Sequence, residues 1–171
     1  IPLPEAFTAL ESYEPPPGRG RLLKGTGGST IIDDSYNASP AAVEEALETL
    51  QTFPHAKRRI AVLGDMLELG RYSSMEHERV GALAGGSADV IVAVGIRARA
   101  FAAGKGNAEI MLFDNARAAA LALPTLVRAG DVILVKGSQS IRTERIVEAL
   151  LANPSDASLL VRQEREWKRR P

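Results

Sequence analysis

Two short segments of this chain consist entirely of aliphatic, mostly β-branched residues, and they constrain the fold more than any other feature. They are Val90–Val94 and Val132–Val135. A strand that is apolar on both faces is typical of a parallel sheet that helices cover on each side. Other short apolar runs alternate with segments of helical period along the rest of the chain. This alternation predicts an α/β fold with a Rossmann-like, doubly wound and mostly parallel sheet.

The first two predicted strands differ from the rest because a glycine-rich turn joins them directly. Segments 21–24 and 29–34 flank Gly25–Gly28, which predicts a hairpin that adds an antiparallel edge. A phosphate loop at this turn is disfavoured because no Lys follows it and it leads into a strand. We expect further strands at 60–63, 89–94, 109–113 and 132–135, and helices at 3–13, from Pro40 with Ser39 as N-cap, and at 73–85, 96–103, 115–128 and 143–152.

The prolines mark the organisation of the chain. Its 171 residues fit one domain with additions at its ends, and Pro15–Pro17 force an extended segment. We therefore expect residues 1–17 to be the end of a preceding domain and a Pro-rich linker. Residues 18–152 are then the folded domain, and residues 153–171 a charged, flexible tail. The missing initiator Met fits a piece of a longer protein.

Charge and composition exclude several classes of protein. The 21 Lys and Arg residues balance 21 Asp and Glu residues, so nothing favours a nucleic-acid partner. The absence of cysteine excludes a disulfide scaffold, a zinc–thiolate site and a thiol nucleophile. The apolar runs are far shorter than the roughly 20 residues that span a bilayer. We expect a cytoplasmic protein with no membrane partner and no metal site.

Polar loops follow three of the predicted strands, at the edge where open α/β sheets bind ligands. Asp33 and Asp34 could bind a metal, hydrogen-bond a ribose or orient a cation, or they could be turn residues. Lys136 could meet a carboxylate or a phosphate, or be an exposed Lys beside a tight turn. The loop at 64–70 could be a mobile flap or a packed loop. His77, between two Glu residues of a predicted helix, is expected at the surface.

Four spaced motifs resemble the C-terminal domain of the Mur ligases. Three of them are Asp33–Pro40, Leu63–Gly70 and Val135–Ser138, in this order. The fourth, Pro15–Arg19, resembles the junction between the central and C-terminal domains of these enzymes. The resemblance covers about residues 5–152 and is strongest to the ligases that add D-alanyl-D-alanine.

The resemblance implies a reaction that this chain would share with two further domains. The first domain holds a UDP-sugar, and the central ATPase domain binds most of the ATP and Mg²⁺. ATP activates the carboxylate of UDP-MurNAc-tripeptide as an acyl phosphate, which the amine of D-Ala-D-Ala attacks to give a peptidoglycan precursor. The chain would then be part of a bacterial, monomeric carbon–nitrogen ligase, with its own central domain as partner. Because the catalytic residues lie elsewhere in such enzymes, the chain alone is expected to be inactive.

The resemblance also implies site residues. Arg19 matches the Arg that approaches the ATP phosphates, and Asp34 matches the Asp that contacts the ribose. Tyr36 and Asn37 match loop positions beside the nucleotide.

A second loop would face the incoming dipeptide. Lys136, Ser138 and Ser140 match this loop, whereas Gln139 stands where the family commonly has Arg. At Gln139 this loop therefore departs from the family pattern.

An alternative function is a receiver-like phosphoacceptor domain in signalling. Such domains carry an acidic pair, a further Asp and a Lys after successive strands, as Asp33, Asp34, Asp65 and Lys136 do here. Against this class, Ala93–Gly95 lacks the hydroxyl expected near a phosphoryl group. A stand-alone Rossmann cofactor domain would need a Gly-x-Gly-x-x-Gly turn between its first strand and helix, which is absent.

Overall fold

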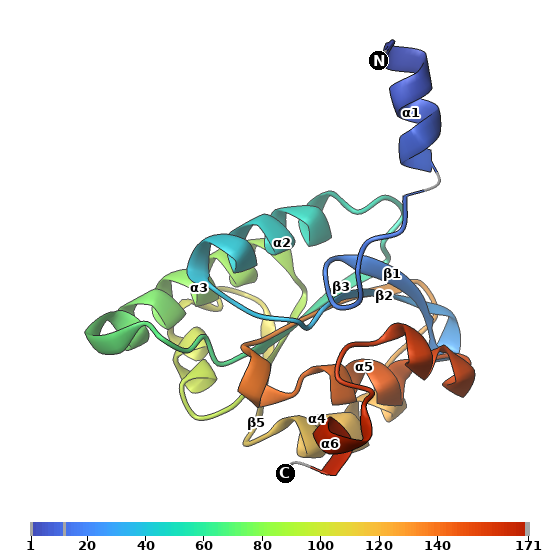
Figure 1. Cartoon of the computed structure of the whole chain (residues 1–171). Helices are drawn as coiled ribbons and strands as arrows, with labels where there is room; N and C mark the ends of the chain where they lie inside the picture. Colours follow the sequence, from blue (N-terminus) through green and yellow to red (C-terminus); the bar gives the residue numbers. More distant parts are fainter. Residues whose placement is uncertain (1, 12, 170–171) are drawn as a thin grey trace.

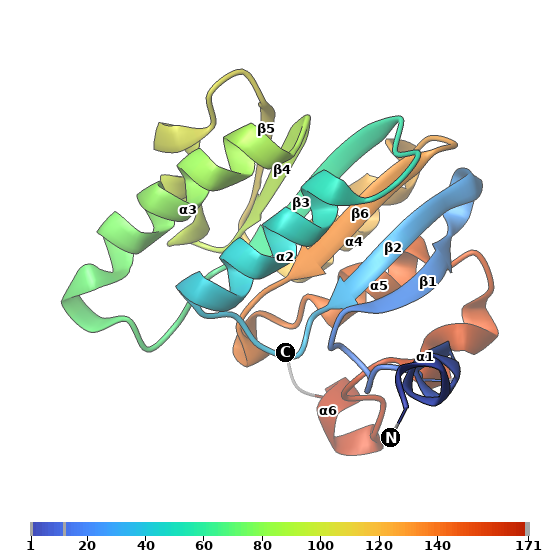
Figure 2. The same cartoon turned by 90° about the horizontal axis from the view of Figure 1, so that it is seen from above.

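A computed structural model describes residues 2–11 and 13–169 and shows a six-stranded sheet with helices on both faces (Figures 1 and 2). The strands are β1 (Arg21–Gly25), β2 (Ser29–Asp34), β3 (Arg58–Gly64), β4 (Val90–Val94), β5 (Glu109–Phe113) and β6 (Asp131–Lys136). The helices are α1 (Leu3–Glu11), α2 (Pro40–Thr52), α3 (Ser73–Ser87), α4 (Ala116–Ala122), α5 (Glu144–Leu150) and α6 (Arg165–Arg169). None of the described helices is long and apolar enough to cross a membrane.

The sheet runs in the order β1-β2-β6-β3-β4-β5. Only the β1–β2 pair is antiparallel, and the other four pairs are parallel. The predicted parallel sheet with an antiparallel hairpin is therefore confirmed. Because β6 lies between β2 and β3, the last strand brings its carboxyl end between the ends of the first two parallel strands. The register sets Lys136 of β6 beside Asp34 of β2 and beside Leu63 of β3.

Two apolar cores lie on opposite faces of the sheet, because successive residues of a strand point to opposite faces. In β6, Leu134 packs with α2 and α3 on one face, while Ile133 packs with α4 and α5 on the other. Every residue of β4 and β6 is buried. These are the two strands that contain the continuous apolar runs of the sequence. Burying a side chain such as Leu134, which is 0% exposed, contributes about 2 kcal/mol.

Local signals set most of the element boundaries. The Ser39 side chain accepts a hydrogen bond from the Ala42 amide at 3.4 Å, and Pro40 opens α2, as predicted. The helix expected at 115–128 is shorter than predicted. Regular α4 ends at Ala122 and a 3₁₀ turn follows, because Pro124 has no N–H to continue the ladder.

Helix α1 stands apart from the sheet, at the end of the extended segment that contains the three prolines (Figure 1). Its side chains Leu3, Phe7 and Leu10 are 72%, 63% and 64% exposed. A short helix is marginally stable in water unless its apolar side chains pack against a partner surface. The helix predicted here is therefore present, but it adds nothing to the two cores.

The structure corrects the expectation of a flexible tail at residues 153–171 for the start of that segment, and residues 170–171 lie outside the described part of the chain. A 3₁₀ turn, Pro154–Leu159, leads to Leu160, which is 4% exposed and packs in the core beside α4 and α5. Arg162 is also buried, and α6 follows. The prediction failed because the apolar run 159–161 is too short, in an otherwise polar stretch, to give a periodic signal.

Candidate functional site

An ion pair joins the ends of β2 and β6 at the carboxyl edge of the sheet. The Lys136 ammonium lies 2.5 Å from Asp34 Oδ2 and donates a second hydrogen bond to the Asn37 carbonyl at 3.0 Å. Lys136 is 4% exposed, whereas the Asp34 side chain is 18% exposed. A hollow of about 490 Å³ opens on this pair and is also lined by Arg19. Hydrogen bonds within the domain therefore fix the pair, while the hollow leaves it accessible to a ligand.

The turn after β2 connects this hollow to the linker. The Tyr36 amide donates to the Gly18 carbonyl at 3.1 Å. Gly18 has φ +68°, and a Cβ there would lie 3.0 Å from the Tyr36 nitrogen, so only glycine fits. The next residue, Arg19, places its guanidinium carbon 4.1 Å from the centre of the Tyr36 ring. The predicted nucleotide residues Arg19, Asp34, Tyr36 and Asn37 thus lie together.

Asp33 shapes this turn from inside. Its Oδ1 accepts hydrogen bonds from the Ser35 amide at 3.2 Å and the Ser35 hydroxyl at 2.5 Å. Asp33 is 0% exposed, and its Oδ2 has no hydrogen-bond partner among the described residues. Burial raises the pKa of Asp33, and the hydrogen bonds from Ser35 oppose that rise. Of the acidic pair, Asp33 is therefore the turn residue and Asp34 the one that faces the hollow.

A second and larger hollow, of about 600 Å³, lies between the loops that follow β2, β3 and β6. Gln139 and Ser140 line it and are exposed, whereas Ser138 is 4% exposed. The Ser138 hydroxyl accepts from the Leu67 amide at 2.9 Å and donates to the Ala38 carbonyl at 3.4 Å. Ser138 therefore ties the three loops together, while its two neighbours face the opening.

The loop after β3 packs against α3 through Met66 and His77, both of which are buried. The position of His77 corrects a prediction. His77 is 0% exposed, although a surface position was expected. Its Nε2 accepts from the Met66 amide at 3.0 Å, and its Nδ1 lies 2.7 Å from the Ser73 carbonyl. Because a carbonyl only accepts, the proton is assigned to Nδ1. The helical spacing of His77 with Val80 and Ala84, both buried, was the signal that the flanking Glu residues obscured.

Asp65, the acid at the start of this loop, also has a structural role. Its Oδ1 accepts from the Ala98 amide at 2.7 Å, and Arg97 lies 3.6 Å from its Oδ2. Within residues 2–11 and 13–169, no three His, Asp or Glu side chains are grouped so that they could hold a metal ion. The acids at this edge of the described chain therefore do not form a magnesium site by themselves.

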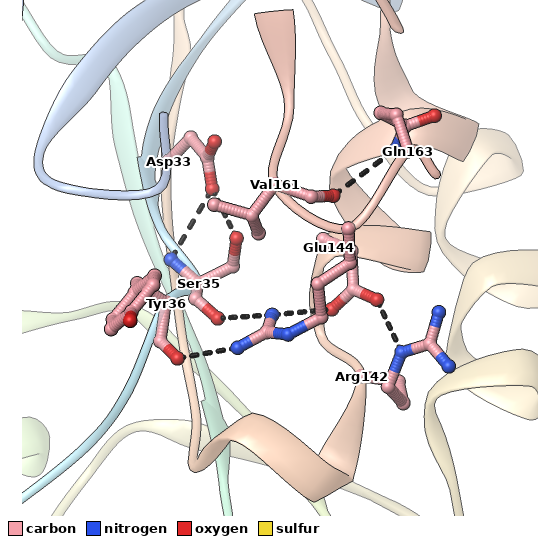
Figure 3. A network of polar contacts seen from close by, with 8 residues as sticks. Asp33, Ser35, Tyr36, Arg142, Glu144, Val161 and Gln163 are labelled. Carbon is pink, nitrogen blue, oxygen red and sulfur yellow. Dashed lines mark hydrogen bonds and ion pairs between the residues drawn. The ribbon is translucent and has the colours of Figure 1, made fainter. Parts of the chain in front are cut away.

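A buried charge network beside the Tyr36 turn had no counterpart in the sequence analysis (Figure 3). Glu144 is 1% exposed and lies between two arginines. Its Oε1 is 2.5 Å from Arg142 Nε, and its Oε2 is 3.0 Å from Arg162 Nη1. Arg162 is 127 residues from Ser35, whose carbonyl it contacts, so local spacing could not reveal it.

The fold and this edge define an α/β domain whose polar loops gather at the carboxyl ends of parallel strands. The family model described as "Mur ligase, glutamate ligase domain" matches residues 18–139. The chain therefore belongs to the Mur ligase family. This membership removes the receiver-like alternative.

The chain is similar to curated D-Ala-D-Ala-adding ligases over most of its own length. It is 32% identical over 181 residues to the UDP-N-acetylmuramoyl-tripeptide–D-alanyl-D-alanine ligase of Mycobacterium tuberculosis (strain CDC 1551 / Oshkosh), covering 91% of this chain and 35% of that protein. It is 35% identical over 148 residues to the Synechocystis ligase of the same name, covering 84% and 32%. The chain thus spans about a third of these relatives' length.

Solved structures agree with the fold. The MurF ligase from Thermotoga maritima in complex with ADP superposes with a TM-score of 0.71 at 34% identity, over 83% of this chain and 32% of that one. MurF from Acinetobacter baumannii superposes with a TM-score of 0.75 at 28% identity, over 90% and 34%.

Proposed function

We propose that this chain is the C-terminal domain of an ATP-dependent ligase that adds D-Ala-D-Ala to UDP-MurNAc-tripeptide in the bacterial cytoplasm. The observation that carries the proposal is made in a member of the Mur ligase family: Arg19 and Asp34 line one hollow, Tyr36 stacks on Arg19, and the Asn37 carbonyl shares Lys136 with Asp34. Residues 1–17 are then the end of the central ATPase domain and its linker, and the C-terminal domain begins at residue 18 and includes Leu160 and Arg162, which pack against residues 18–152. The exposed apolar side chains of α1 support this division, because they would be covered by the central domain.

The hollow beside Asp34 would take the nucleotide. The Asp34 carboxylate accepts hydrogen bonds and is oriented by Lys136, so it suits the hydroxyl groups of a ribose. Arg19 is exposed at the rim and stacked on Tyr36, and its guanidinium can hold two phosphate oxygens at once. Lys136 would act through Asp34, since its two hydrogen bonds go to Asp34 at the end of β2 and to Asn37 in the loop that follows.

The larger hollow would take the dipeptide. Gln139 and Ser140 offer an amide and a hydroxyl at its exposed rim, and Ser138 fixes the loop that carries them. These neutral donors can hydrogen-bond the dipeptide's carboxylate, although Gln139 lacks the charge of the Arg that is common in the family.

The chain's contribution to the reaction would be to bind, orient and exclude water. ATP and Mg²⁺ would be held mainly by the central domain, where the metal would neutralise charge on the phosphates. Closure about the segment before Gly18 would carry Arg19 towards those phosphates. The closed site would keep water from the acyl phosphate until the dipeptide amine attacks.

The test is ADP release by the full-length parent protein supplied with ATP, Mg²⁺, UDP-MurNAc-tripeptide and D-Ala-D-Ala, omitting each in turn. Release that requires both the tripeptide and the dipeptide is expected. Release that ignores D-Ala-D-Ala but responds to another amine would overturn the substrate and point to Gln139. No release with any amine would overturn the ligase activity itself.

A further inference from the structure

The segment after α5 crosses the carboxyl edge of the sheet and meets both the linker and the β2 turn. We call residues 160–169 the strap. Leu160 anchors its start in the core, and Val161 Cγ1 lies 3.0 Å from the position of a Cβ on Gly18. The backbone then turns at Arg162 with φ +59°, a conformation that a non-glycine residue adopts only when its surroundings fix it.

The Arg162 side chain supplies that fixation by holding the β2 turn. Its Nη1 donates to the Ser35 carbonyl at 3.2 Å, and its Nη2 donates to the Tyr36 carbonyl at 2.5 Å. Figure 3 shows the carbonyls of Ser35 and Tyr36 and the carboxylate of Glu144 directed at the same guanidinium. One buried cation therefore satisfies two backbone carbonyls and the Oε2 of Glu144, whose Oε1 is bound by Arg142.

Through the turn, Arg162 also sets the nucleotide-facing side chains. The Tyr36 ring has the Arg19 guanidinium 4.1 Å from its centre and the Arg162 guanidinium at 5.7 Å. The position of the Tyr36 backbone decides where this ring lies, and the ring supports Arg19. The Asn37 carbonyl, which accepts the hydrogen bond from Lys136, follows in the same turn.

The strap also forms part of the second hollow. Trp167 lines the hollow of about 600 Å³ together with Gln139 and Ser140. The guanidinium carbons of Arg142 and Arg162 lie 5.4 Å and 5.8 Å from the centre of its ring. The two arginines that bind Glu144 therefore also hold Trp167 in place.

We propose that the strap completes the ligand site, with Arg162 as a positioning residue for the nucleotide-binding turn and Trp167 as a wall of the dipeptide hollow. The proposal rests on the proposed function for the identity of the two ligands. Its structural part, that Arg162 fixes the turn at residues 35–39, is independent of that function.

The sharpest variant is Arg162→Gly in the full-length parent. Glycine accepts the positive φ without strain, so the variant removes the guanidinium and leaves the backbone free to keep its path. The KM for ATP is expected to rise at least about tenfold, the loss typical of hydrogen bonds to a charged group. Millimolar guanidinium chloride should restore part of this loss by filling the vacated space. Arg165→Met, which removes an exposed arginine of α6, is the matched control and should match the wild type.

Hydrogen exchange separates this proposal from the proposed function. In Arg162→Gly, the amides of residues 35–39 should exchange at least about tenfold faster, while those of β4 should keep their protection. Trp167→Ala should leave that exchange unchanged and raise the KM for D-Ala-D-Ala several-fold. Unchanged exchange at residues 35–39, or an unchanged KM for ATP in folded Arg162→Gly, would overturn the proposal. If the wild-type parent shows no dipeptide-dependent ADP release, the proposed function falls and the exchange result still decides the role of Arg162.

Discussion

Strand β6 carries a buried charge at each end, and the two ends of the sheet use that charge differently. At the amino end, Asp131 is 2% exposed and both of its oxygens are engaged. Arg58 Nε lies 3.0 Å from Oδ1 and Nη2 lies 2.6 Å from Oδ2, and the Arg128 amide donates to Oδ2 at 2.8 Å. The hydrogen bond that Arg58 donates to Asp131 raises the pKa of Arg58, so the guanidinium stays charged. This end is closed.

At the carboxyl end, the ion pair of Lys136 and Asp34 has protein partners on one side and a hollow on the other. Lys136 has two partners among the described residues and three N–H donors. Asp34 meets Lys136 through Oδ2 and faces a hollow of about 490 Å³. A buried carboxylate whose two oxygens are both paired serves the fold, whereas a buried pair that opens on a hollow can serve a ligand.

The largest expected effect is on stability, at the closed end. Arg58→Met leaves the Asp131 carboxylate buried without its counter-ion, so the free energy of unfolding should fall by about 3 kcal/mol. Urea unfolding followed by circular dichroism measures this. The control is Arg99→Met, which breaks an exposed pair with Asp114 and should cost less than about 0.5 kcal/mol. Equal losses in the two variants would remove the distinction between buried and exposed pairs here.

The next effect is on activity, at the open end. Asp34→Ala should lower kcat/KM for ATP of the full-length parent by about 10- to 100-fold, because a hydrogen bond to a charged group is lost. The loss of stability should be smaller than in Arg58→Met, since water can reach Lys136 through the hollow. Asp114→Ala removes an exposed carboxylate after β5 and should keep full activity. Wild-type ATP use by Asp34→Ala would refute the assignment.

Arg19 gives a smaller change of the same kind. Its side chain is exposed and stacked on Tyr36, so Arg19→Ala should leave the melting temperature nearly unchanged. Turnover should fall about tenfold, as expected for one phosphate contact at a solvated site. A variant that unfolds instead would make Arg19 structural.

Asp33 offers the smallest effect, and one that depends on pH. Its pKa in the folded chain is raised above the ordinary 3.8, so the fold favours the protonated form. The stability that this protonation adds is present below pH 3.8 and is lost as pH rises through the folded-state pKa. Asp33→Asn should therefore show less loss of stability over that window, and be no less stable than the wild type at neutral pH. A steeper fall with pH in the variant would contradict the burial of Asp33.

Much of the fold could be predicted because its strongest signals are local. The continuous apolar runs of β4 and β6 and the cap at Ser39 each depend on residues close together in the chain. The edge that carries the polar loops followed from the alternation of strands and helices. The resemblance then named Asp34 and Lys136, which the structure brings together.

The rest depends on contacts between distant residues. Arg162 reaches carbonyls 126 and 127 residues away, and nothing in its neighbourhood marks it as buried. His77 was assigned to the surface because its neighbours are charged, although its buried face follows a helical period. Side chains of this kind are placed by the packing of whole elements, which a local pattern does not contain.

The most direct test of the difference between the two ends is hydrogen exchange of the full-length parent with and without a non-hydrolysable ATP analogue. The amides of residues 34–39 and 136–140 should gain protection, and those of residues 58–59 and 128–131 should not. This result would place the nucleotide at the carboxyl end of the sheet. Protection at the amino end, with none at residues 34–39, would contradict the account.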